Sequence, residues 1–163
     1  VNVHHPQCTG HGGVVHNALY LQPCAPPVQP TPKNSREDAE ARILLGDSLM
    51  MAGKVDLAIY HYNIALWLHP EYQSTAYIGL ANCFVQKSDT MTAQHLYAEA
   101  LRVQPSCVPA WCGIAGLYSR AGNTQRALLC YKEALTFQPE CADAHRGLAQ
   151  ALKDMGRLEE SAQ

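Results

Sequence analysis

Cysteine and histidine are the residues whose side chains offer chemistry in this 163-residue chain, which contains seven cysteines and eight histidines. Near the amino terminus, Cys8, His11, His16 and Cys24 include enough soft or borderline ligands for one zinc ion. Their spacing matches no compact zinc motif, and the same stretch also fits a histidine-rich flexible arm. We favour the arm, and expect no metal site and no cofactor.

A catalytic cysteine needs a thiolate with a base within reach. The remaining cysteines include Cys83, Cys107, Cys112 and Cys141, and none has a histidine at a useful spacing. The sequence also contains no glycine-rich phosphate loop and no nucleophile elbow. The cysteines are therefore expected to act as small apolar core residues, and the chain is expected not to be an enzyme.

Composition limits the kinds of partner and location. The chain is 47% hydrophobic and 16% charged, with a formal net charge of -2, which is typical of a globular domain. Phosphate binding usually shows as a basic stripe, so we expect no nucleic-acid partner. We expect no membrane partner either, because no apolar run approaches the roughly 20 residues of a membrane span. The odd cysteine count and the lack of an N-glycosylation sequon favour an intracellular, cytoplasmic location.

The elements that would position a site are predicted to be helix pairs. Trp111, Ile114, Ala115 and Tyr118 lie three and four residues apart, as on one face of a helix that ends at Gly122. A second helix is predicted to face it with small and aromatic residues at the same spacing: Ala127, Tyr131 and Ala134. Two helices in about 34 residues cannot bury both faces alone, so the pair requires stacked neighbours.

The same pattern recurs at residues 39–72, 74–107 and 108–141, with a partial unit at 142–163. These units resemble tetratricopeptide repeats (TPRs), although Arg42 stands where the family usually has an aromatic residue. The resemblance covers residues 39–163 and implies an all-α fold, a right-handed α-solenoid of antiparallel helix pairs.

Residues 1–38 are expected to be a separate Pro- and His-rich segment, since they hold six of the ten prolines. The run from Pro23 to Pro32 predicts an extended linker. Just before it, Ala18-Leu19-Tyr20-Leu21-Gln22-Pro23 is similar to the ends of the predicted second helices, such as Ala134 to Pro139. Residues 14–22 are thus either a remnant second helix or a short apolar patch in a disordered tail.

Three local expectations follow from the repeat pattern. Leu45 of the first unit should face the core. The Lys87-Ser88-Asp89 turn, which lacks a glycine, should be the least regular of the turns. The fourth unit should turn at Gly156 and break off where a second helix would begin, so we interpret the chain as a piece of a longer protein.

Glycines recur at intervals of 34 residues, at Gly79, Gly113 and Gly147. Each weakens its helix by roughly 0.5–1 kcal/mol relative to alanine, so repeated use requires a reason. Either a neighbouring helix packs closely against these positions, which we favour, or they leave room for a ligand.

The resemblance also implies a concave groove lined by the first helix of each unit. The residues that it places there are Ile43, Asp47, Met50, Met51, Ile78, Asn82, Gln86, Cys112, Gly116, Ser119, Arg120, Arg146, Gln150, Lys153 and Asp154. Such a groove changes from apolar to more basic along its length, which suits a peptide with an apolar anchor and a carboxylate. The alternative is that Ile43, Met50 and Met51 pack under the amino-terminal segment.

One known TPR chemistry is expected to be absent. TPR co-chaperones that hold an acidic carboxyl terminus use Lys, Asn and Arg on successive first helices. The corresponding positions here are occupied by Ile43, Asp47, Gly79, Pro109 and Gly113.

The function that the resemblance implies is that of a scaffold or adaptor that binds a partner protein or peptide in the groove. The alternative is the non-catalytic arm of a larger enzyme, for example a glycosyltransferase, that recruits substrate or oligomerises. Because the fourth unit lacks its second helix, Leu148 and Leu152 should expose apolar surface, and self-association through this open end is expected.

Overall fold

The computed structural model describes residues 35–69 and 72–161, and all regular structure in these ranges is helical. The helices are α1 (Ser35–Met51), α2 (Val55–Leu68), α3 (Gln73–Gln86), α4 (Thr90–Val103), α5 (Val108–Arg120), α6 (Thr124–Phe137) and α7 (Ala142–Ser161). None of these helices is long and apolar enough to cross a membrane. The zinc candidates, the proline-rich linker and the remnant helix at 14–22 lie outside the described residues.

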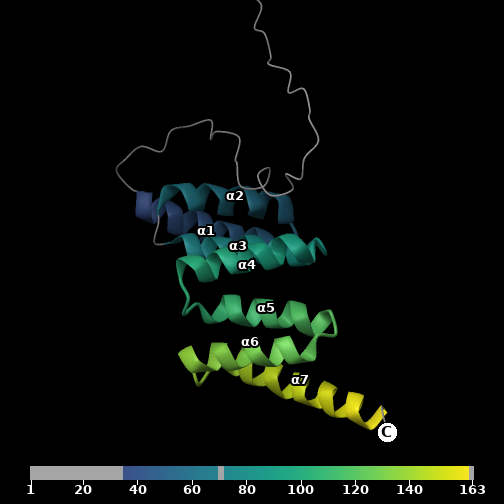
Figure 1. Ribbon diagram of the computed structural model, residues 1–163. Coiled ribbons are helices and arrows are strands. Elements are labelled where there is room, and N and C mark those ends of the chain that lie inside the picture. The colour runs from purple at the N-terminus through teal and green to yellow at the C-terminus, as the bar shows by residue number, and fades with distance from the viewer. Residues whose placement is uncertain (1–34, 70–71, 162–163) are drawn as a thin grey trace, which may run out of the picture.

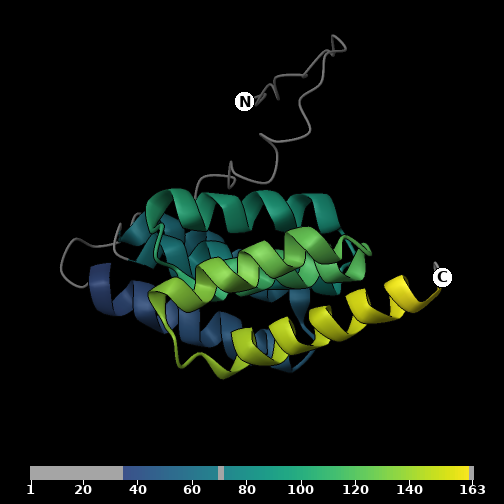
Figure 2. The same ribbon diagram turned by 60° about the horizontal axis from the view of Figure 1, so that its bottom comes forward.

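The helices form antiparallel pairs that stack in chain order, α1 with α2, α3 with α4 and α5 with α6, followed by α7 (Figure 1). Each second helix also packs against the first helix of the next pair. Viewed obliquely from the α7 end, α4 and α6 lie above α1 and α7 (Figure 2). The stack therefore has a layer of first helices and a layer of second helices.

The two layers differ in spacing. First helices contact one another from pair to pair, α1 with α3, α3 with α5 and α5 with α7. Within the described part of the chain, no two second helices make a comparable contact. The stack therefore curves toward the first-helix layer, which forms its concave side. The predicted all-α solenoid of antiparallel helix pairs is confirmed.

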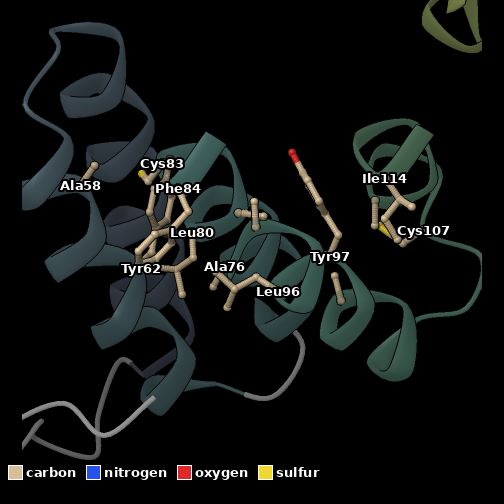
Figure 3. Packing of buried hydrophobic residues seen from close by; sticks show 14 of the residues in the cluster. Ala58, Tyr62, Ala76, Leu80, Cys83, Phe84, Leu96, Tyr97, Cys107 and Ile114 are labelled. Carbon is tan, nitrogen blue, oxygen red and sulfur yellow. The ribbon is translucent and has the colours of Figure 1, made fainter. Parts of the chain in front are cut away.

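Small and aromatic residues build the core at the positions that the repeat predicts. Ala58, Ala93 and Ala127 are fully buried, which lets the helix backbones approach closely. Three tyrosines fill the space between successive pairs and are 0%, 4% and 8% exposed: Tyr62, Tyr97 and Tyr131. In Figure 3, Tyr62 lies beside Leu80 and Phe84, whereas Tyr97 points between its own pair and the next. The tyrosines thus join each pair to its successor.

The turn without a glycine is as regular as the others, so the expectation for Ser88 was wrong. Ser88 has φ +62°, close to the +73° of Gly53 and the +74° of Gly122. In all three turns, this residue's amide donates to the carbonyl three residues earlier, and the next amide donates to the carbonyl five residues earlier. These paired bonds satisfy the helix's last carbonyls and hold serine in a left-handed conformation.

Two other local expectations were also wrong. Leu45 is 44% exposed and does not face the core, because no helix precedes α1 among the described residues. Gly156 lies inside α7, which continues to Ser161. At Gly53 and Gly122 a second helix packs back on the first and fixes the turn, whereas the residues after Gly156 have no such pairing in the described chain.

Arg42, and His145 at the equivalent position of the fourth unit, stand where the family usually has an aromatic residue, and both make polar contacts instead. Arg42 Nη1 lies 3.1 Å from His61 Nδ1, which joins α1 to α2. His145 Nε2 lies 2.6 Å from the Pro139 carbonyl oxygen, to which it donates. At the equivalent place one unit earlier, Trp111 Nε1 donates to the Pro105 carbonyl at 2.9 Å. The imidazole of His145 therefore replaces the indole of Trp111 in tying the helix start to the preceding turn.

Candidate functional site

The concave layer carries a row of equivalent positions, Asp47, Asn82 and Gly116, which we call the inner row. In the first two units a buried tyrosine reaches this row from the second helix. Tyr62 Oη donates to Asp47 Oδ1 at 2.5 Å, and Tyr97 Oη donates to Asn82 Oδ1 at 2.5 Å. A ring that packs against the next pair is thus fixed by a polar group on its own first helix.

The third position of the inner row has neither a carboxylate nor an amide. A Cβ built on Gly116 meets no atom within 4 Å, so the space beside this residue is open. Arg120 lies one helical turn further along α5 and is exposed. Burial raises the pKa of Tyr97 and of Tyr131, and the positive charge of Arg120 opposes both shifts. Arg120 is therefore within electrostatic reach of two tyrosine hydroxyl groups, next to the opening at Gly116.

The glycines repeated every 34 residues serve helix packing. A Cβ on Gly79 would lie 2.4 Å from Tyr62 Cε1, one on Gly113 2.4 Å from Tyr97 Cζ, and one on Gly147 2.2 Å from Tyr131 Cζ. Each glycine thus receives the tyrosine ring of the preceding pair. Close packing, the alternative that we favoured, is confirmed.

The apolar end of the predicted groove is only partly available. Ile43 is 6% exposed and belongs to the core, so its predicted place on the groove wall was wrong. Met50 and Ile78 are half-buried against the same core cluster, whereas Met51 is 86% exposed. Met51 is therefore the most accessible apolar side chain of this end, and Gln86 is exposed at the equivalent position of α3.

The other end carries charged side chains on α7. Arg146 is exposed and pairs with Asp143, which lies on the same helix. Gln150 Nε2 donates to Asp154 Oδ1 at 2.8 Å, and Lys153 is exposed. Exposed pairs of this kind contribute little to stability, so these side chains can exchange partners readily. Ser119, at the carboxyl end of α5, is also exposed.

The thiols near this surface are poor nucleophiles. Burial raises the pKa of Cys83 to about 11. For Cys112, burial and the neighbouring Cys141 raise the pKa to about 12. Both thiols are protonated near neutral pH, whereas nucleophilic attack requires a thiolate.

Sequence reasoning missed two exposed apolar surfaces. On α1, Leu44 and Leu45 are 59% and 44% exposed. On α2, the face opposite the buried alanines carries Leu57, Tyr60 and Trp67, which are 52%, 49% and 66% exposed. The signal was available in a comparison of units, because the residues equivalent to Leu57, Tyr60 and Trp67 are Thr92, His95 and Arg102 on α4.

The tetratricopeptide repeat family model matches residues 78–136 and 112–163, which together span more than half of the chain. The chain therefore belongs to the tetratricopeptide repeat family. No curated protein sequence matches it.

Solved structures similar to the chain include TPR domains. The Arabidopsis OM64 TPR domain is 18% identical with a TM-score of 0.65, over 73% of this chain and 98% of that one. The first TPR of Spaghetti (RPAP3), bound to the HSP90 peptide SRMEEVD, is 18% identical with a TM-score of 0.65, over 74% and 94%. The Sgt2 TPR domain from Aspergillus fumigatus is 16% identical with a TM-score of 0.69, over 77% and 83%. At these identities the likeness establishes the fold.

Proposed function

We propose that the chain is a protein-interaction module that binds a partner peptide along its first-helix layer. The observation that carries this proposal is the inner row, where two positions are filled by tyrosine-bonded polar groups and the third, Gly116, opens beside Arg120. An open position next to an exposed guanidinium suits a carboxylate, because arginine binds carboxylates through two parallel hydrogen bonds.

The anchor of such a peptide would be apolar. Met51 is largely exposed toward the α1 end of the same layer, and methionine adapts its shape to varied apolar side chains. The peptide would therefore place an apolar residue near Met51 and a carboxylate near Arg120, and lie across α3 between them. The cysteines of the described residues are free, which supports an intracellular partner.

The Spaghetti structure offers a precedent for a TPR domain holding a peptide with an acidic end. The manner of binding would differ in this chain. Ile43 is buried and Gly79 and Gly113 are covered by tyrosine rings, so these positions of the co-chaperone clamp present no cation to a terminal carboxylate. We therefore propose that Arg120 supplies the positive charge, and that SRMEEVD is at best a weak ligand.

The test is to select, from a library of random peptides with free carboxyl ends, those peptides that bind the chain. Enriched peptides should share an apolar residue and an acidic group, and should bind Arg120→Glu at least about tenfold more weakly than the unchanged chain, since loss of a charge-assisted pair weakens binding on this scale. Gly116→Leu, which fills the opening, should weaken the same peptides.

Lys132→Glu is the matched control, because it makes the same charge change at an exposed position of α6 in the second-helix layer. It should leave the affinity unchanged. The proposal fails if selection yields no shared sequence. It also fails if selected peptides bind Arg120→Glu and Gly116→Leu as well as they bind the unchanged chain.

A further inference from the structure

The exposed side of α1 is a copy of the face that every later first helix presents to the second helix before it. Four of its positions are exposed: Ala41, Leu44, Leu45 and Ser48. We call these residues the α1 seat. Their equivalents on α3, α5 and α7 are buried or half-buried: Ala76, Gly79, Leu80, Cys83, Ala110, Gly113, Ile114, Leu117, Ala144, Gly147, Leu148 and Ala151.

The residues of the α1 seat are suited to packing against a second helix. Ala41 is equivalent to an alanine in each later unit, and Leu45 is equivalent to leucine or isoleucine. Exposed leucines next to each other on a helix surface are unfavourable in water, and their exposure here is 59% and 44%. The α1 seat is therefore built to be covered by a helix.

We propose that residues 14–22 of the same chain form that helix and complete the amino-terminal end of the solenoid. Their sequence, continuing to Pro23, repeats the pattern with which α4 and α6 end, an Ala-Leu pair followed three residues later by Gln-Pro. Aligned in this way, Ala18 is equivalent to the buried Ala65, and Val15 is equivalent to Tyr62.

Side-chain size provides an independent argument for this pairing. In the later units a large tyrosine meets a glycine, as Tyr62 meets Gly79 and Tyr97 meets Gly113. At the α1 seat, a leucine stands at the glycine position, and the residue that would meet it is Val15. The large residue has moved from the second helix to the first, as expected for two positions that share one space.

The chain between residues 14–22 and α1 is long enough to let this segment reach the α1 seat. The residues between Pro23 and Ser35 would span roughly 30 Å or more when extended, and α1, with 17 residues, is about 25 Å long. The segment can therefore lie antiparallel to α1, as α2 does to α3. A longer connection than that of the later units adds little to the entropy of loop closure.

The test is hydrogen exchange of the whole chain, with the amides of residues 16–22 as the readout. We expect these amides to exchange at least about tenfold more slowly than in the urea-denatured chain. Leu44→Glu should abolish this protection. Leu129→Glu should keep it, because Leu129 is similarly exposed, at 63% against 59% for Leu44, but lies on α6 away from the seat.

Exchanging the sizes of the side chains at positions 15 and 44 makes the test specific for this pairing. Val15→Tyr alone should remove the protection, because a tyrosine has no room against Leu44. Combined with Leu44→Gly, which recreates the pairing of the later units, it should restore the protection. The proposal is overturned if residues 16–22 exchange as in the denatured chain. It is also overturned if Leu44→Glu has no effect, or if protection rises with protein concentration, which would show that a second copy covers the seat.

Discussion

The ring of Tyr97 lies so close to the backbone of Gly113 that a Cβ on Gly113 would stand 2.4 Å from the ring carbon Cζ. This contact crosses from one helix pair to the next, so it couples the stability of neighbouring units. The ring is 4% exposed and its hydroxyl is bonded to Asn82 on its own first helix. Neither end of the tyrosine can therefore move to make room for a methyl group without loss of a contact.

We predict that Gly113→Ala destabilises the chain by about 1–3 kcal/mol through overpacking. Gly116→Ala, three residues along the same helix, should instead stabilise it by about 0.5–1 kcal/mol, because its Cβ meets no atom within 4 Å and alanine favours the helix. The measurement is urea denaturation followed by circular dichroism. Equal effects of the two substitutions would show that helix propensity, and not the Tyr97 ring, governs these positions.

A second prediction concerns alkaline pH. Burial, and then the hydrogen bond to Asp47, raise the pKa of Tyr62 far above its ordinary value of 10.0. The folded chain therefore retains a proton that the unfolded chain releases above pH 10, so the stability from this group falls as pH rises through that value. Between pH 9 and pH 11 the loss from one such tyrosine amounts to about 1 kcal/mol.

Tyr62→Phe removes the ionisable group and tests this prediction. The variant should be less stable than the unchanged chain at pH 7, by about 0.5–1.5 kcal/mol for the lost hydrogen bond. Its free energy of unfolding should then fall less between pH 9 and pH 11. Parallel curves for the two proteins over this range would mean that Tyr62 ionises alike in the folded and unfolded states.

The third prediction concerns Ser88, which holds φ +62° where two other turns use glycine. A left-handed conformation costs a residue with a Cβ roughly 1–2 kcal/mol, and glycine avoids most of this. Ser88→Gly should therefore stabilise the chain by up to about 1 kcal/mol in urea denaturation. Ser106→Gly, in a turn without a positive φ, is the control and should give no gain.

The sequence predicts most of this fold because the pattern of each unit reflects contacts inside the unit. Ala58 and Tyr62 are buried by their own helix pair and the next one, so their spacing alone identifies them. Ser88 shows where such reasoning fails. The carbonyls of Phe84 and Val85 accept the backbone hydrogen bonds that impose the turn. The conformational preferences of serine do not predict a left-handed residue at this position.

Residues at the ends of the stack are harder to predict, because their burial depends on neighbours. Leu45 and Leu80 occupy equivalent positions, yet they are 44% and 2% exposed, because α2 covers only Leu80. Ile43 illustrates the opposite error. Its position in the repeat predicts a place on the groove wall, whereas its large side chain joins the core. Position in a repeat gives the direction of a side chain, and size and neighbours decide its exposure.

The last prediction concerns the α7 end, where Leu152 is 50% exposed and Leu148 is half-buried. The equivalent residues of α5, Tyr118 and Ile114, pack between units, so α7 presents an apolar stripe that its own unit does not cover. We expect the chain to self-associate through this stripe at high concentration. Leu152→Glu should shift sedimentation toward the monomer, whereas Leu129→Glu, an exposed leucine on α6, should not. If both substitutions act alike, general surface hydrophobicity drives the association; if neither acts, the stripe on α7 is not the contact, and the exposed face of α2 around Trp67 becomes the next surface to test.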